Sequence, residues 1–198
     1  MEQLYKDYLL EQSKFRDEII TDLSQLFAQI HDNCQQSTFG VQNFIDLIKE
    51  AQIDGVTTVD YPPEESREFV NKLGKENIDS IFLLSPTTED DRIKLIAEQA
   101  SGFLYYVSLK GVTGAANIDI KQVSEKVNNI KKYSDLPVAV GFGVRDADTA
   151  KSVAEISDAV VIGSRIVKEI EASDKNQVIS NVKKLVSNMK NAIETSKV

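Results

Sequence analysis

The sequence predicts an α/β fold built on a parallel β-sheet. From Thr38 onward, apolar runs of four to seven residues alternate with segments of helical periodicity, which is typical of consecutive βαβ units. Such short apolar runs suit strands that are covered on both faces. All nine glycines and all four prolines lie at Gly40 or later, so the first 39 residues follow a different pattern.

Residues 1–38 are predicted to form a helical segment, as one long amphipathic helix or two helices joined near Ser13. Their apolar residues recur close to helical spacing, at Leu4, Tyr8, Phe15, Ile19, Leu23, Leu26 and Ile30. Such a stripe must be buried against something. It would pack on the following domain, residues 39–198, or would mediate contact with a partner helix or self-association of the chain.

Five strands are predicted in the second region, at residues 53–59, 78–84, 103–108, 137–140 and 159–162. Helices are predicted at residues 41–51, 64–74, 90–100, 120–133, 147–156 and 175–195. Thr88 and the acids after it fit the start of one helix, Asp146 can cap another, and Pro63 suits a first helical position. Right-handed crossovers would place consecutive strands side by side.

Composition narrows the classes of function. The formal net charge is −8 and no long basic run occurs, which disfavours binding to nucleic acid or to an anionic membrane. Cys34 is the one cysteine, so no internal disulfide is possible and a cytoplasmic setting fits best. His31 is the one histidine, and neither residue has metal-ligand spacing with a third donor, so no metal site is expected. No run of signal-peptide or transmembrane type is apparent.

Three glycine-containing loops follow predicted strands. They are Gly111-Val112-Thr113-Gly114, Gly141-Phe142-Gly143 and Gly163-Ser164. Glycine lets the backbone approach a ligand closely, and a helix that starts there offers free N–H groups to an anion. Two such loops after neighbouring strands form a common phosphate site, so a phosphorylated small molecule is the predicted ligand. The alternative is that these loops are ordinary βα turns.

Four motifs in these regions resemble the tryptophan synthase alpha chain family, over residues 39 to 198. They are IDGVTTVDYPPEE at 53–65, GFLYYVS with GVTGA at 102–115, PVAVGFGV at 137–144 and IGSRIV at 162–167. The resemblance implies a partial (β/α)8-type barrel, with about five parallel strands and flanking helices. It also implies an indole-3-glycerol phosphate lyase of tryptophan biosynthesis that uses no cofactor and pairs with a pyridoxal-phosphate beta chain.

The resemblance assigns roles to particular residues. Phosphate would be bound by Gly114, Gly143, Gly163 and Ser164. The indole pocket would be lined by Gly141 and Phe142, with further apolar lining from Leu83 and Val59. Thr113 would belong to a mobile lid, and Tyr105 would lie beside the reacting carbons.

The resemblance also implies two acid–base carboxylates in an early stretch of the Gly-Ile-Pro-Phe-Ser-Asp-Pro type, and the printed sequence contains no such stretch. Asp60 matches a family aspartate outside that pair. The chain would then retain the phosphate half of the site, with weak or no activity alone. Open alternatives are an inactive engineered or recombined half-barrel scaffold, an oligomerising protein, and a chain completed by a separate barrel fragment.

Overall fold

A computed structural model describes residues 40–59, 61–108, 119–141 and 143–195. The chain divides into two compact units, which are described separately below. The first unit comprises residues 1–54 and 60–78, and the second comprises residues 55–59 and 79–198. The helical segment predicted at residues 1–38 lies outside the described residues.

The described part of the first unit contains helices α2 (Gly40–Glu50) and α3 (Pro63–Lys75). The rings of Phe44 on α2 and Phe69 on α3 lie 6.1 Å apart between centroids, and both side chains are buried. Tyr61 meets Phe69 edge-on, also at 6.1 Å. Aromatic pairs at this separation stabilise a small core beyond the area they bury. Pro63 occupies the start of α3, as predicted.

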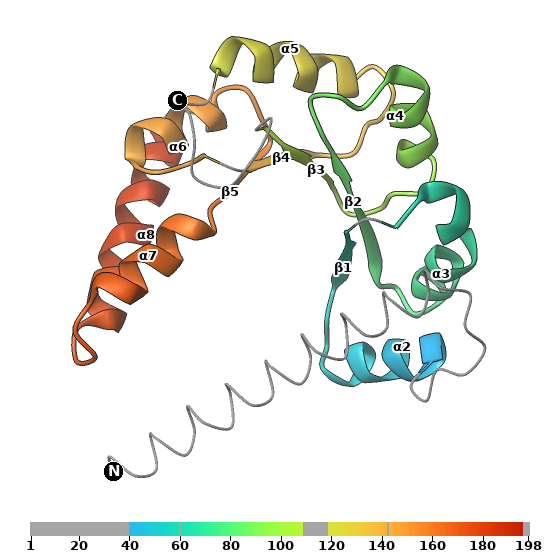
Figure 1. Cartoon of the computed structure of the whole chain (residues 1–198), viewed down its shortest axis with the longest axis horizontal. Coiled ribbons are helices and arrows are strands. Elements are labelled where there is room, and N and C mark those ends of the chain that lie inside the picture. Colours follow the sequence, from blue (N-terminus) through green and yellow to red (C-terminus); the bar gives the residue numbers. More distant parts are fainter. Residues whose placement is uncertain (1–39, 60, 109–118, 142, 196–198) are drawn as a thin grey trace. The chain divides into compact units, whose positions relative to one another are not determined.

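The second unit is built on a five-stranded parallel sheet in the order β1-β2-β3-β4-β5 (Figure 1). Its strands are β1 (Gly55–Thr58), β2 (Asp79–Leu84), β3 (Leu104–Val107), β4 (Val138–Gly141) and β5 (Ala159–Val161). The five predicted strands and their sequential order are confirmed. Among the described residues, β1 and β5 form the two edges of this sheet.

The described part of the second unit also contains five helices (Figure 1). They are α4 (Asp90–Ala97), α5 (Ile120–Ile130), α6 (Ala147–Ala154), α7 (Ser164–Ala172) and α8 (Val178–Glu194). Helix α7 is absent from the predicted elements, although its apolar residues Ile166, Val167 and Ile170 recur at helical spacing; none of its side chains is fully buried. None of the described helices is both long and apolar enough to cross a membrane.

Two helix starts in the described part of this unit are capped by aspartates. Asp146 accepts a hydrogen bond from the Thr149 N–H at 2.8 Å, so its predicted cap on α6 is confirmed. Asp119 caps α5 through the N–H groups of Lys121 and Gln122. The expected cap by Thr88 is wrong. The Thr88 hydroxyl accepts instead from the Ser85 N–H at 2.9 Å, and the N-cap position of α4 is Glu89, whose side chain makes no capping hydrogen bond.

Alternate residues of the strands point to opposite faces of the sheet. Leu104 and Tyr106 of β3 are buried, while Tyr105 and Val107, which alternate with them, are only half-buried. Leu84 lies on the same face as Tyr106, because β2 and β3 pair Leu84 with Tyr106. This face packs against the core of the unit, while the half-buried Leu83 and Tyr105 lie on the other face.

The cap on α6 makes a prediction about stability. Replacing Asp146 with Ala should lower the free energy of unfolding by about 1 kcal/mol, since two donors of Thr149 lose their acceptor. Chemical denaturation of the two proteins measures this difference. Asp146→Asn keeps an acceptor oxygen and should lose less than Asp146→Ala; an equal loss would contradict the cap.

The contribution of the Asp146 cap to the free energy of unfolding depends on pH. Hydrogen bonds from the Thr149 hydroxyl and N–H hold the pKa of Asp146 below its ordinary value of 3.8. A carboxylate with a lowered folded pKa stabilises the protein fully above its unfolded pKa, and this contribution disappears as the pH falls through the folded pKa. The free energy of unfolding of the wild type, relative to that of Asp146→Asn, should therefore fall as the pH drops below about 4.

Candidate functional site

The glycine turns after β4 and β5 lie at the same end of the sheet, where the strands have their carboxyl ends. These two strands pair in parallel, with Gly141 opposite Val161, so their carboxyl ends meet there. Gly141 is the last residue of β4, and Gly143 follows with a φ of +81°, a conformation that side chains rarely adopt. Gly163 follows β5 by two residues and precedes α7.

The start of α7 has the properties of an anion site. Gly163 is the N-cap and offers no side chain to the first turn, while its carbonyl accepts from the Ile166 and Val167 N–H groups at 2.9 and 3.2 Å. Among the described residues, none accepts a hydrogen bond from the backbone N–H of Ser164 or Arg165. Unpaired N–H groups at a helix start favour a bound anion.

Three residues predicted for the site share one face of the sheet. Strand pairing sets Leu83 opposite Tyr105, and Val107 opposite Gly141. Because alternate residues share a face, Leu83, Tyr105 and Gly141 lie together, on the face opposite Tyr106. Val59 directly follows β1 and is 54 % exposed. Of the residues predicted to line an apolar pocket, the structure places Leu83 and Gly141 on one face with Tyr105.

Tyr105 packs directly over Gly141. A Cβ atom added to Gly141 would lie 2.5 Å from the Tyr105 hydroxyl oxygen and 2.6 Å from a ring carbon. Only glycine leaves room for the ring in this position. Burial raises the pKa of the Tyr105 phenol, so at neutral pH this group can donate a hydrogen bond and cannot act as a base.

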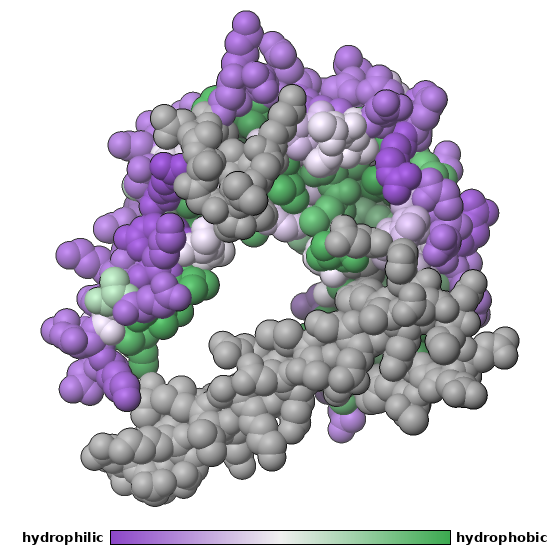
Figure 2. Space-filling model, in the orientation of Figure 1, coloured by the Kyte–Doolittle hydropathy of each residue, from purple (hydrophilic) through white to green (hydrophobic). Residues whose placement is uncertain are grey.

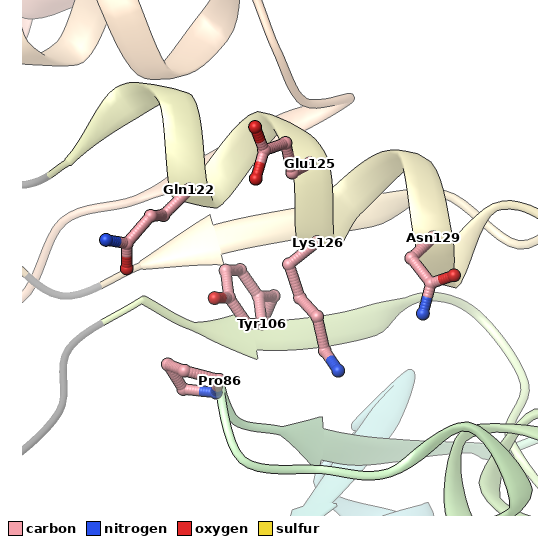
Figure 3. Close-up of a pocket in the computed structure, with 6 residues that line it drawn as sticks. All are labelled: Pro86, Tyr106, Gln122, Glu125, Lys126 and Asn129. Atoms are coloured by element: carbon pink, nitrogen blue, oxygen red, sulfur yellow. The ribbon is translucent and has the colours of Figure 1, made fainter.

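The neighbouring Tyr106 points to the other face and lines a separate cavity of about 270 Å³ (Figure 3). Helix α5 supplies most of the wall, with Gln122, Glu125, Lys126 and Asn129, and Pro86 closes one side. Lys126 Nζ donates to the Thr88 carbonyl, and the Asn129 amide donates to Asp90 at 2.7 Å. Two of the polar lining groups are thus already paired within the protein. No glycine loop or charge cluster in the sequence indicates this cavity.

A third feature lies beside Gly163. An apolar cavity of about 350 Å³ opens between the end of β5 and helices α7 and α8, lined mainly by Ile162, Ile166, Val186, Met189 and Ile193. The exposed large apolar side chains on the same two helices are Val167, Ile170, Ile179 and Val186. Figure 2 shows hydrophobic atoms at the surface in the region of α7. Periodicity alone did not indicate that these side chains would remain exposed.

Other predicted residues lie outside the described residues. These are Thr113 and Gly114 of the first glycine loop, Phe142, Asp60, His31 and Cys34. Within the described ranges, no group of three or more His, Cys, Asp or Glu side chains could hold a metal ion. The described residues thus place the start of α7 at the carboxyl end of the sheet and an apolar surface beside Tyr105.

Comparison of the sequence with known proteins gives one family. A sequence model described as "Tryptophan synthase alpha chain" matches residues 35–194. A tryptophan synthase alpha chain of Janthinobacterium sp. (strain Marseille) is 53 % identical over 155 residues, which cover 78 % of this chain and 58 % of the relative. A tryptophan synthase alpha chain of Nitrosomonas europaea is 51 % identical, with 78 % and 56 % covered. The chain thus spans less than two thirds of the length of these curated relatives.

Solved structures agree with the sequence comparison. The crystal structure of tryptophan synthase subunit alpha from Legionella pneumophila str. Paris superposes with a TM-score of 0.69 at 32 % identity, covering 79 % of this chain and 58 % of that one. A structure of Mycobacterium tuberculosis tryptophan synthase gives a TM-score of 0.68 at 29 % identity, covering 78 % and 57 %. The five parallel strands with their flanking helices therefore match part of a (β/α)8 barrel.

The contact between Tyr105 and Gly141 is open to a direct test. Gly141→Ala should lower the free energy of unfolding by about 1–3 kcal/mol, because the new methyl group overlaps the ring. In the double variant Tyr105→Ala/Gly141→Ala, the added cost of the Gly141 change should largely disappear. Denaturation of the four proteins gives the coupling energy; additive effects would show that the ring does not cover Gly141.

Proposed function

Because this chain belongs to the tryptophan synthase alpha chain family, we propose that its glycine turns after β4 and β5 bind the phosphate group of a substrate of the indole-3-glycerol phosphate type. The observation that carries this proposal is the start of α7, where Gly163 leaves the Ser164 and Arg165 N–H groups available. Gly143 lies at the neighbouring turn. Ser164 is exposed and adds a hydroxyl as a further donor.

The apolar end of the same ligand is proposed to lie against the sheet face that carries Leu83 and Tyr105, with Val59 at its rim. Gly141 supports this role because its missing side chain gives the Tyr105 ring its place. Phe142, from the turn between Gly141 and Gly143, is proposed as an apolar wall. Thr113 and Gly114 would complete the enclosure as parts of the lid and the phosphate turn. No cofactor is required for this binding mode.

The family reaction is a retro-aldol cleavage of indole-3-glycerol phosphate into indole and glyceraldehyde 3-phosphate. It needs one proton delivered to indole C3 and one removed from the indole nitrogen. Tyr105 is a titratable group on the described ligand face, and its raised pKa suits a donor rather than a base. We propose that the chain by itself binds the ligand but cleaves it weakly or not at all. An inactive scaffold or oligomerising protein is the alternative.

Two kinds of protein partner are proposed. A tryptophan synthase beta chain is the partner that the family implies. A separate fragment that supplies further β/α units is the other, because β1 and β5 end the described sheet with unpaired edges. Self-association through residues 1–38 stays a prediction from their periodicity. Measuring the mass of the assembly in solution, with and without a beta chain, distinguishes these partners.

Ligand binding should appear as thermal stabilisation. Glycerol phosphate or indole-propanol phosphate at a hundred times its dissociation constant should stabilise the folded protein by about 2.7 kcal/mol. For a chain of this length that corresponds to a rise of about 5–11 °C in the melting temperature. Differential scanning fluorimetry with millimolar ligand is the measurement; an unchanged melting temperature would refute the phosphate site.

Gly163 offers a matched pair of variants for this measurement. A Cβ at Gly163 meets nothing within 4 Å, so Gly163→Ala should change stability by less than about 1 kcal/mol. Its methyl group would nevertheless stand among the N–H groups proposed to bind phosphate, and it should abolish most of the ligand-induced shift. Gly74→Ala in α3 also places its Cβ in open space. This control should retain the full ligand-induced shift.

Catalysis by the chain alone should be at background. Loss of an acid–base group typically costs on the order of 10²–10⁴-fold in rate, and both family carboxylates lie in a stretch that the printed sequence lacks. Indole release from indole-3-glycerol phosphate, followed with a chromogenic indole reagent, measures this. A full-length alpha chain serves as the positive control, and robust turnover by this chain would show that another group supplies the proton transfers.

A further inference from the structure

Ser108 directly follows β3 and donates two hydrogen bonds to one acceptor. Its backbone N–H lies 3.1 Å from the Gly141 carbonyl oxygen, and its hydroxyl lies 2.9 Å from the same oxygen. The first contact continues the pairing of β3 with β4 by one step beyond Val107 and Gly141. The second is an additional side-chain contact at the carboxyl edge of the sheet, 33 residues away in sequence.

Gly141 is thereby held from two directions. The Tyr105 ring occupies the space where a Cβ would stand, and Ser108 holds the carbonyl. A peptide bond is planar, so the direction of a carbonyl sets the direction in which the chain continues. The carbonyl of Gly141 begins the turn that leads to Gly143, whose φ is +81°. Ser108 thus acts where the chain leaves β4.

We propose that Ser108 is a positioning residue for the phosphate site: by holding the Gly141 carbonyl, it sets the path of the turn at Gly143. This inference rests on the proposed function, because it assigns the turn to the same phosphate group. Ser108 acts through Gly141 and needs no contact with the ligand. The ligand class is a phosphate monoester, whose oxygens accept hydrogen bonds from backbone N–H groups.

The test compares Ser108→Ala with Ser108→Thr. The alanine removes the hydroxyl donor and keeps the backbone N–H, whereas threonine keeps a hydroxyl and suits an extended segment. Ser108→Ala should weaken binding of glycerol phosphate about two- to tenfold, the value of one net hydrogen bond, and Ser108→Thr should restore it. Ser152→Ala is the matched control, because the Ser152 hydroxyl also donates to a backbone carbonyl, that of Asp148, at 3.0 Å.

A second measurement separates this inference from the proposed function. The carbonyl ¹³C resonance of Gly141 reports its hydrogen bonds whether or not a ligand binds. It should move in Ser108→Ala, together with the amide resonance of Gly143, and should stay in place in Ser152→Ala. If wild type fails to bind glycerol phosphate, the proposed function fails, and these resonances alone decide whether Ser108 positions the turn. Unchanged resonances in Ser108→Ala would overturn the inference. If wild type binds glycerol phosphate, an unchanged affinity of Ser108→Ala would overturn it as well.

Discussion

The parallel register of the sheet is the constraint on which the rest of the structure depends. It brings the carboxyl ends of β4 and β5 together at one edge and sorts alternate residues onto two faces. Tyr105 and Tyr106 are neighbours in the chain, yet the first packs over Gly141 and the second lines a cavity beside α5. A shift of one residue in pairing would exchange these two faces and remove the proposed ligand site.

Within that register, the end of β4 is the most strongly constrained point of the proposed site. Gly141 carries the Tyr105 ring above its Cα and accepts two hydrogen bonds from Ser108 at its carbonyl. Contacts of this kind restrict Gly141 before any ligand binds, and such preorganisation lowers the conformational cost of binding. The start of α7 contributes the other half of the site, with N–H groups that its glycine N-cap leaves available.

The sequence was sufficient to predict five parallel strands, because their apolar runs are short and separated by helical periodicity. Helix α7 was not predicted, although its apolar residues recur at helical spacing; in the structure its Val167 and Ile170 remain exposed. The cap by Asp146 was predicted correctly. The cap by Thr88 was not, because the Thr88 hydroxyl accepts a hydrogen bond from the Ser85 N–H. The contact of Ser108 with Gly141 joins segments 33 residues apart, so no local pattern could indicate it. The family motifs assigned roles to glycines, while packing explains why Gly141 has no side chain.

The central claim is that the turns after β4 and β5 form a phosphate site. A titration with glycerol phosphate, followed by amide ¹H–¹⁵N resonances, tests this most directly, because each N–H group reports separately. The account predicts saturable changes concentrated at Gly143, Gly163, Ser164 and Arg165. Changes that concentrate instead around the Tyr106 cavity at Gln122 and Lys126, or no saturable change at all, would contradict it.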